Sequence, residues 1–115
     1  MDFNFYQKKA FDTAIYPNRR YNYIYPALGL GNEAGEVLGK IKKLERGDYG
    51  DIRESDLVYN EFRIMLEGEL GDVLWYLAVL AEEFDIDLDD VAQANLDKLA
   101  KRKEDNKLMG DGDNR

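Results

Sequence analysis

The sequence contains neither cysteine nor histidine among its 115 residues. Without cysteine, the chain forms no disulfide and offers no thiolate to a metal. Without histidine, it lacks the usual zinc ligand, the usual general base near neutral pH and the histidine of carboxylate di-iron sites. Any metal that this chain binds is therefore held by oxygen ligands, and a di-metal oxidase is a weak hypothesis.

Proline and long apolar runs are also scarce. Only Pro17 and Pro26 occur, so long helices are possible over most of the chain. No apolar run approaches the roughly 20 residues of a membrane span. The N-terminus begins Met-Asp-Phe-Asn-Phe and lacks the basic and apolar regions of a signal peptide. We therefore expect a cytoplasmic protein with no membrane partner.

Basic residues are outnumbered, with 16 Lys and Arg against 24 Asp and Glu, which gives a formal net charge of −8. An acidic surface repels duplex nucleic acid, so we expect no nucleic-acid polymer as a partner. A local basic cluster could still bind a small anion. Hydrophobic residues make up 44% of the chain, which is enough for the core of one domain.

Hydrophobic spacing along the chain predicts an all-α fold. We expect helices over residues 3–16, 26–46, about 56–84 and 88–103, the third capped by Ser55 or Asp56. These helices would form a single domain over residues 1–103. Residues 104–115 are polar and rich in glycine, so we expect them to be a mobile tail.

Two features of the expected helices need an explanation beyond helix propensity. Gly31, Gly35 and Gly39 recur every fourth residue, and each helical glycine costs about 1 kcal/mol relative to alanine. We expect another helix to approach closely there, either within the subunit or across an interface. Trp75 points away from the apolar face of its helix, so it needs cover from an oligomer interface or a nucleobase pocket.

Two acidic pairs carry the strongest chemical signal. Glu33 and Glu36 form the first pair, and Glu69 and Asp72 form the second. Residues three apart share a helix face, so packing the two helices against each other would bring four carboxylates together. Carboxylates repel one another at a partly buried site, and a cation relieves that repulsion. All-oxygen ligation favours Mg²⁺, with Mn²⁺ as a substitute.

A solvated helix face is the competing interpretation, because such pairs also arise by chance in an acidic chain. Placement favours a metal site, since each pair borders an apolar face and is embedded in glycines. Cationic and amide side chains could contact a phosphate-bearing ligand, with Arg offering two parallel hydrogen bonds: Lys40, Lys43, Asn95, Lys98 and Arg102. The alternative for this group is the ordinary basic surface of an amphipathic helix.

The sequence resembles the MazG-like nucleotide pyrophosphohydrolases of the all-α NTP pyrophosphatase superfamily. The resemblance covers roughly residues 24–103 and rests on three segments in order: Leu-Gly-Leu-Gly-Asn-Glu-Ala-Gly-Glu-Val at 28–37, Glu-Leu-Gly-Asp-Val-Leu-Trp-Tyr-Leu at 69–77 and Asn-Leu-Asp-Lys-Leu-Ala-Lys-Arg at 95–102. The closing Gly112-Asp113-Asn114-Arg115 also resembles the tail of many members.

The resemblance implies a bundle of four to five helices that assembles as a homodimer or homotetramer. It implies Mg²⁺-dependent hydrolysis of a nucleoside triphosphate to monophosphate and pyrophosphate. It carries the metal-ligand role onto Glu33, Glu36, Glu69 and Asp72, and a substrate role onto Asn95, Lys98 and Arg102. In the mechanism that we expect, Glu36 also acts on the attacking water, Lys98 and Arg102 contact the phosphates, and Lys40 assists substrate binding.

Two positions depart from the family pattern. Asn32 stands where many members have a further acidic residue, which would reduce the number or the affinity of metals. The stretch between the acidic pairs is long and contains Gly-Asp-Tyr-Gly-Asp at 47–51, which would reshape the entrance for substrate. A non-catalytic helical interaction module, with the glycines as a dimer seam, is the alternative to an enzyme.

Overall fold

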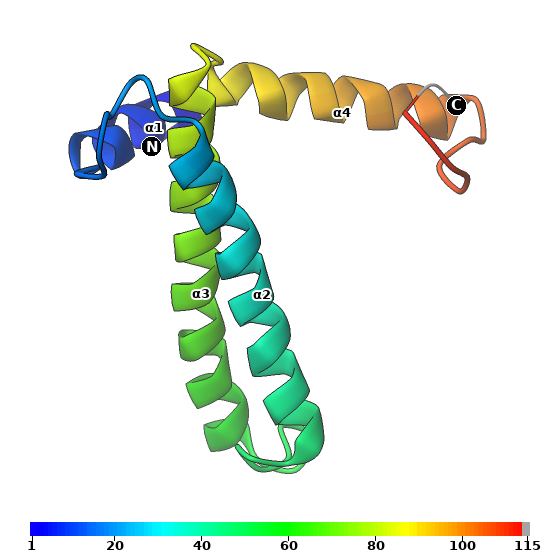
Figure 1. Ribbon diagram of the computed structural model, residues 1–115. Helices are drawn as coiled ribbons and strands as arrows, with labels where there is room; N and C mark the ends of the chain where they lie inside the picture. Colours follow the sequence, from blue (N-terminus) through cyan, green and yellow to red (C-terminus); the bar gives the residue numbers. More distant parts are fainter. Residues whose placement is uncertain (114–115) are drawn as a thin grey trace.

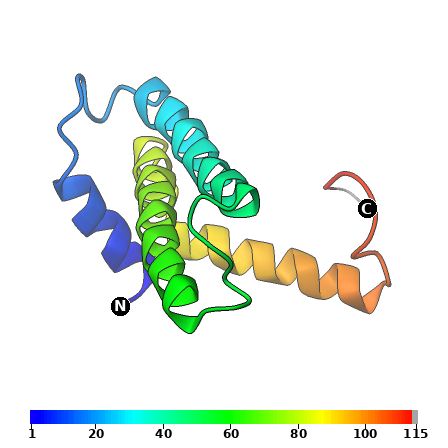
Figure 2. The same ribbon diagram turned by 90° about the horizontal axis from the view of Figure 1, so that it is seen from below.

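The computed structural model describes residues 1–113, and this part of the chain forms four helices and no strand. They are α1 (Phe3–Asp12), α2 (Ile24–Arg46), α3 (Asp56–Glu83) and α4 (Leu88–Glu104). Helices α2 and α3 lie side by side as a long antiparallel hairpin, and α1 packs beside the C-terminal half of α3 (Figures 1 and 2). The prediction of an all-α fold is therefore confirmed, with four helices. Asn114 and Arg115 of the predicted tail lie outside the described residues.

Local sequence explains where the helices begin and end. The carboxylate of Asp2 accepts a hydrogen bond from the Phe5 N–H at 2.7 Å, and the Ser55 hydroxyl accepts one from the Val58 N–H at 3.3 Å. These bonds satisfy donors that a helix N-terminus leaves without an intrahelical partner. Helix α2 ends at Arg46 and is capped by Gly47, whose φ of 93° suits glycine better than any other residue.

Helix α1 is shorter than predicted, because it ends at Asp12 and not at residue 16. The Thr13 hydroxyl donates to the Ala10 carbonyl at 2.6 Å, which competes with continuation of the helix. Pro17 disfavours helical geometry at the residue before it. Ala14 and Tyr16 are buried nonetheless, as part of the loop that packs on α3.

The core lies where α1, the C-terminal half of α3 and the start of α4 meet. Its buried hydrophobic residues are Ala10, Phe11, Ala14, Tyr16, Ala78, Val79, Ala81 and Leu88. Buried Gln7 ties this region together, because its amide nitrogen donates to the Ile86 carbonyl at 2.8 Å and its amide oxygen accepts from the Leu88 N–H at 2.8 Å. The core therefore fixes α1 to the turn between α3 and α4.

Several large apolar residues on the helices are exposed. Leu38 of α2 is 70% exposed, Leu70 of α3 is 51% exposed and Val91 of α4 is 42% exposed. Helices α2 and α3 cover each other on one side only, and α4 runs away from them beyond its first turns (Figure 1). Among residues 1–113, no helix combines the length and the apolarity that a membrane span requires.

Within residues 1–113, the three glycines have no helix of their own subunit packed on them, and Trp75 needs a different explanation from the one predicted. A Cβ atom at Gly31, Gly35 or Gly39 would meet nothing within 4 Å, so no helix of the described chain approaches them. Trp75 is covered by α1 and its following residue, because its ring packs on the core and its indole N–H donates to the Thr13 hydroxyl at 2.8 Å. Neither an interface nor a ligand is needed to explain its position.

Candidate functional site

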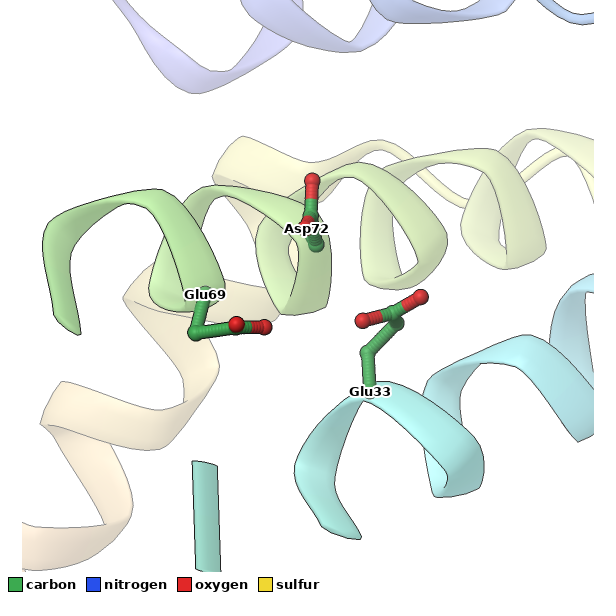
Figure 3. A group of neighbouring side chains, drawn as sticks. All are labelled: Glu33, Glu69 and Asp72. Carbon is green, nitrogen blue, oxygen red and sulfur yellow. The ribbon is translucent and has the colours of Figure 1, made fainter. Parts of the chain in front are cut away.

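The antiparallel pairing of α2 and α3 brings together one member of the first acidic pair and both members of the second. Glu33 on α2 faces Glu69 and Asp72 on α3 (Figure 3). One carboxylate oxygen from each of the three residues lies within 4.8 Å of the others. Glu69 and Asp72 stand on the same face of α3 because they are separated by about one helical turn.

Glu36, the fourth predicted ligand, lies outside this group of three and is exposed. Its charge nevertheless acts on the site. The pKa of the Glu33 carboxyl is raised by partial burial and by the negative charges of its neighbours Asp72, Glu69 and Glu36. Glu36 is therefore close enough to influence the group electrostatically without belonging to its inner set of oxygens.

The donor chemistry of the group fits a hard divalent cation. All three side chains offer carboxylate oxygen, which is the ligand type that Mg²⁺ and Mn²⁺ prefer. Burial and, after it, the negative charges of Asp72, Glu69 and Glu36 raise the pKa of Glu33, as expected for carboxylates that repel one another. A bound cation would offset that repulsion, so the residues present fit the metal that the sequence predicts.

Lys40 is the predicted substrate-binding residue that the fold brings to the acidic group. Its ammonium nitrogen lies 3.9 Å from Oε1 of Glu69, and both side chains are partly buried. Lys40 follows Glu33 by about two turns of α2, so both reach the same side of the hairpin. A positive charge at the edge of the carboxylates is suited to contact an anionic group of a metal-bound ligand.

Asn95, Lys98 and Arg102 lie on α4, which projects away from the α2–α3 hairpin (Figure 1). Asn95 is exposed. Lys98 and the nearly buried Arg102 both pair with the carboxylate of Asp113, at 3.2 Å and 3.3 Å. Within one chain, the described structure therefore holds these cations against the C-terminal segment and not against the acidic group.

Tyr76 is a neighbour of the site to which the sequence alone assigned no role, although it lies on the same flank of its helix as Glu69 and Asp72. Burial, a hydrogen bond with Tyr25 and the charges of Glu33 and Asp72 raise the pKa of its hydroxyl. Its ring lies against Gly29, where a Cβ atom would be only 2.1 Å from Cε1 of the ring. Tyr76 follows Asp72 by four residues, and this helical spacing was the available signal.

Glu83 at the end of α3 fixes the connection between α1 and α2. It accepts hydrogen bonds from the Tyr16 hydroxyl, from the Arg20 N–H at 2.9 Å and from the Asn22 N–H at 3.3 Å. The Tyr16 ring stacks on that of Tyr25, with 4.9 Å between centroids. These contacts set the entry of the chain into α2 and hence help to place Glu33 opposite α3.

Most of the chain matches a known family of proteins. Residues 26–106 match the family model described as the MazG nucleotide pyrophosphohydrolase domain. This range contains α2, α3 and α4, and with them every predicted metal and substrate residue. No solved structure matches the chain significantly.

Two relatives cover most or all of the chain. The Gene 37 protein of Mycobacterium phage L5 is 42% identical over a 120-residue alignment that covers 100% of both chains. A protein named Uncharacterized protein YvdC, from Bacillus subtilis (strain 168), is 34% identical over 94 residues, which cover 78% of this chain and 87% of that protein. Neither name states a reaction, so the reaction class comes from the family model.

Proposed function

We propose that this chain, which belongs to the MazG nucleotide pyrophosphohydrolase family, hydrolyses nucleoside triphosphates between the α and β phosphates. Water would form a bond to phosphorus at that linkage while the bridging P–O bond breaks. The products would be a nucleoside monophosphate and pyrophosphate. The oxygen of water would end on the phosphorus that it attacks, and its protons would pass to solvent or to the phosphate oxygens of the products. The grouping of Glu33 with Glu69 and Asp72 is the observation that supports this reaction.

We assign metal binding to Glu33, Glu69 and Asp72, with Glu36 as a further ligand on the exposed side. Mg²⁺, or Mn²⁺ in its place, would supply positive charge that polarises phosphate oxygens and offsets the charge of the triphosphate. The chain's own residues then need only to hold the carboxylates in place and to orient the substrate. Tyr76 and Gly29 serve this purpose by fixing the distance between α2 and α3 at the site.

We assign proton removal from the attacking water to Glu36. It is exposed beside the three clustered carboxylates, so its oxygens are accessible to solvent. A general base must lie within hydrogen-bond reach of the proton that it removes, directly or through one water. Lys40, which lies next to Glu69, would contact a phosphate oxygen of the substrate.

We further propose that the protein acts as a homodimer or homotetramer. Large apolar residues are exposed on α2, α3 and α4, and burying them would favour association: Leu28, Leu38, Ile64, Leu70, Leu96 and Leu99. Assembly would also explain how the substrate residues predicted on α4 reach a site. Asn95, Lys98 and Arg102 do not meet the acidic group of their own chain, and a second copy would allow them to contact substrate bound there.

A panel of NTPs and dNTPs with Mg²⁺ tests the reaction, with monophosphate, pyrophosphate and orthophosphate separated by chromatography. We expect equal amounts of monophosphate and pyrophosphate as the first products, and no reaction in EDTA. Orthophosphate as the first product would contradict cleavage between the α and β phosphates.

A non-catalytic helical interaction module is the second candidate, and the exposed apolar residues of α2 and α3 favour it. Calorimetry separates the two functions. An enzyme of this class should release or absorb heat on binding Mg²⁺ together with a non-hydrolysable nucleotide for at least one base. Absence of binding across all bases, with a stable oligomer, would favour the interaction module.

A further inference from the structure

A cavity of about 330 Å³ opens between the start of α1, the C-terminal half of α3 and the start of α4. Its lining residues are Met1, Asp2, Phe3, Tyr6, Leu74 and Asp89. This volume is at the lower end of the range for small-molecule sites, about 300–1,000 Å³. It is therefore suited to one ring system and not to a whole nucleoside triphosphate.

Tyr6 connects this cavity with the acidic group of α2 and α3. Its side chain lines the cavity and also packs against the hydrophobic core. The carboxylate of Asp72 points toward α1, the helix that carries Tyr6 (Figure 3). Burial and the charge of Asp72 together raise the pKa of Tyr6, in keeping with this proximity. A ligand held at the acidic group could thus extend past Tyr6 into the cavity.

The cavity favours an uncharged flat ring over a phosphate. Phe3, Tyr6 and Leu74 supply aromatic and apolar walls, and its lining contains no Lys or Arg side chain, although the N-terminal ammonium of Met1 lies at its edge beside Asp2. The carboxylates of Asp2 and Asp89 would repel a phosphate. Each accepts a backbone hydrogen bond through Oδ1, from Phe5 and Phe3 respectively. Within residues 1–113, no hydrogen bond to either Oδ2 atom is present, so these atoms are available as acceptors.

We propose that this cavity is a base pocket: it receives the nucleobase of the substrate and favours bases that carry an exocyclic amino group. The proposal rests on the proposed function, because the triphosphate must be held at Glu33, Glu69 and Asp72 for the base to reach the pocket. An amino group of the base can donate a hydrogen bond to one of the carboxylates that line the pocket. A carbonyl oxygen at the same position would be repelled, because both it and the carboxylate are hydrogen-bond acceptors. Stacking on Tyr6 would contribute affinity for every base.

Calorimetry with Mg²⁺ tests the pocket by comparing a non-hydrolysable dCTP analogue with inorganic tripolyphosphate, which has no base. In the full-length chain, we expect Tyr6→Ala to weaken nucleotide binding about 10-fold, as loss of one stacking contact does. Binding of tripolyphosphate should stay unchanged, which also shows that the variant is folded. Equal weakening of both ligands would overturn the base pocket. Failure of both to bind the wild-type chain would overturn the proposed function itself.

Asp89→Asn provides a second test that keeps the backbone contact, because the asparagine Oδ1 still accepts from the Phe3 N–H. The readout is kcat/KM for two pairs that differ in amino or carbonyl at one position, dCTP with dUTP and dATP with dITP. We expect the wild type to favour the amino member of at least one pair by about 10-fold, and Asp89→Asn to reduce this preference below about 2-fold, mainly through KM.

Asp90→Asn is the matched control for this experiment. Asp90 is the next residue of α4, is exposed and does not line the cavity. Its substitution makes the same change of charge and should leave the base preference as in the wild type. A wild-type enzyme that hydrolyses both members of each pair equally well would overturn the proposal. The same conclusion would follow if Asp89→Asn retained the full preference while pyrophosphate release remained Mg²⁺-dependent.

Discussion

At the scale of single residues, the pKa of Glu33 reflects the burial and the like charges of the site. Partial burial and the charges of Asp72, Glu69 and Glu36 raise its pKa. In the metal-free protein, Glu33 therefore keeps its proton to a higher pH when the chain is folded than when it is unfolded. The folded state then binds more protons in this range, so its stability falls as pH rises from the ordinary glutamate pKa through the raised value.

Glu33→Gln should remove this repulsion. In EDTA at pH 7, we expect the variant to have a higher Tm than the wild type, because a neutral amide adds no charge to the group. The difference should shrink as the pH falls through the raised pKa of Glu33 and should be smallest below the ordinary glutamate pKa of about 4.3, where the wild-type carboxyl is protonated in both states. Thermal denaturation followed by circular dichroism at several pH values measures both effects. A lower Tm for the variant at pH 7 would contradict the proposed repulsion.

Asp72→Asn should weaken binding of the metal. Changes to residues that only support metal ligands typically cost 10–100-fold in affinity or activity, and Asp72 is assigned as a ligand. We expect the affinity for Mn²⁺, measured by calorimetry or by electron paramagnetic resonance of free Mn²⁺, to fall by at least about 10-fold. Asp90→Asn serves as the control for an equal loss of charge elsewhere. Equal affinities in the two variants would rule out Asp72 as a ligand.

At the scale of helices, the close approach of α2 to α3 beside Tyr76 requires a glycine at position 29. The Tyr76 ring occupies the space where a side chain at position 29 would lie. By contrast, the glycine pattern at positions 31, 35 and 39 faces open space within the chain. Some helical glycines of this chain are therefore required by close contact with another side chain and others are not, and the sequence pattern alone does not distinguish the two kinds.

Gly29→Ala and Gly31→Ala form a matched pair that tests this difference. A Cβ at position 29 would collide with the Tyr76 ring, so we expect a loss of about 1–3 kcal/mol in the free energy of unfolding. A Cβ at position 31 meets nothing, so we expect a gain of up to about 1 kcal/mol from helix propensity. Urea denaturation measures both. Similar effects of the two substitutions would contradict the role of Gly29.

The helices and the acidic group were largely predictable, because both follow local spacing. Helices α2, α3 and α4 each begin and end within about two residues of the predicted limits. Helix α1 is shorter than predicted because of Thr13 and Pro17. The pairing of Glu33 with Glu69 and Asp72 followed from packing two helices antiparallel. The contact of Tyr76 with Gly29 and the cover of Trp75 by α1 were not predictable, because they depend on how distant helices lie in space.

At the scale of the whole molecule, the described chain leaves much apolar surface uncovered. Leu38 and Ile64 are each about 70% exposed, and most of α4 extends away from the other helices (Figure 2). Hydrophobic spacing in the sequence predicts that each helix has an apolar face, but it does not predict which other element covers that face. A single chain has too few helices to cover both sides of the α2–α3 hairpin, which is why we propose a homodimer or homotetramer.

Leu38→Glu should disturb this assembly. We expect the wild type to be a dimer or tetramer in analytical ultracentrifugation, and the variant to shift toward monomer at micromolar concentration. A charge placed among buried apolar side chains is costly unless it is paired. Lys8→Glu, which places the same residue on the surface of α1, is the control. A monomeric wild type, or an unchanged oligomer in Leu38→Glu, would contradict an interface at this position.

The central claim is that the carboxylates of α2 and α3 form the metal-dependent site of nucleotide hydrolysis. The most direct test compares pyrophosphate release by the wild type and by Glu69→Gln as a function of Mg²⁺ concentration, with a mixture of dNTPs as substrate. We expect Mg²⁺-dependent release of pyrophosphate by the wild type and at least about 10-fold less by the variant. Full activity in Glu69→Gln, or activity of the wild type in EDTA, would contradict the claim.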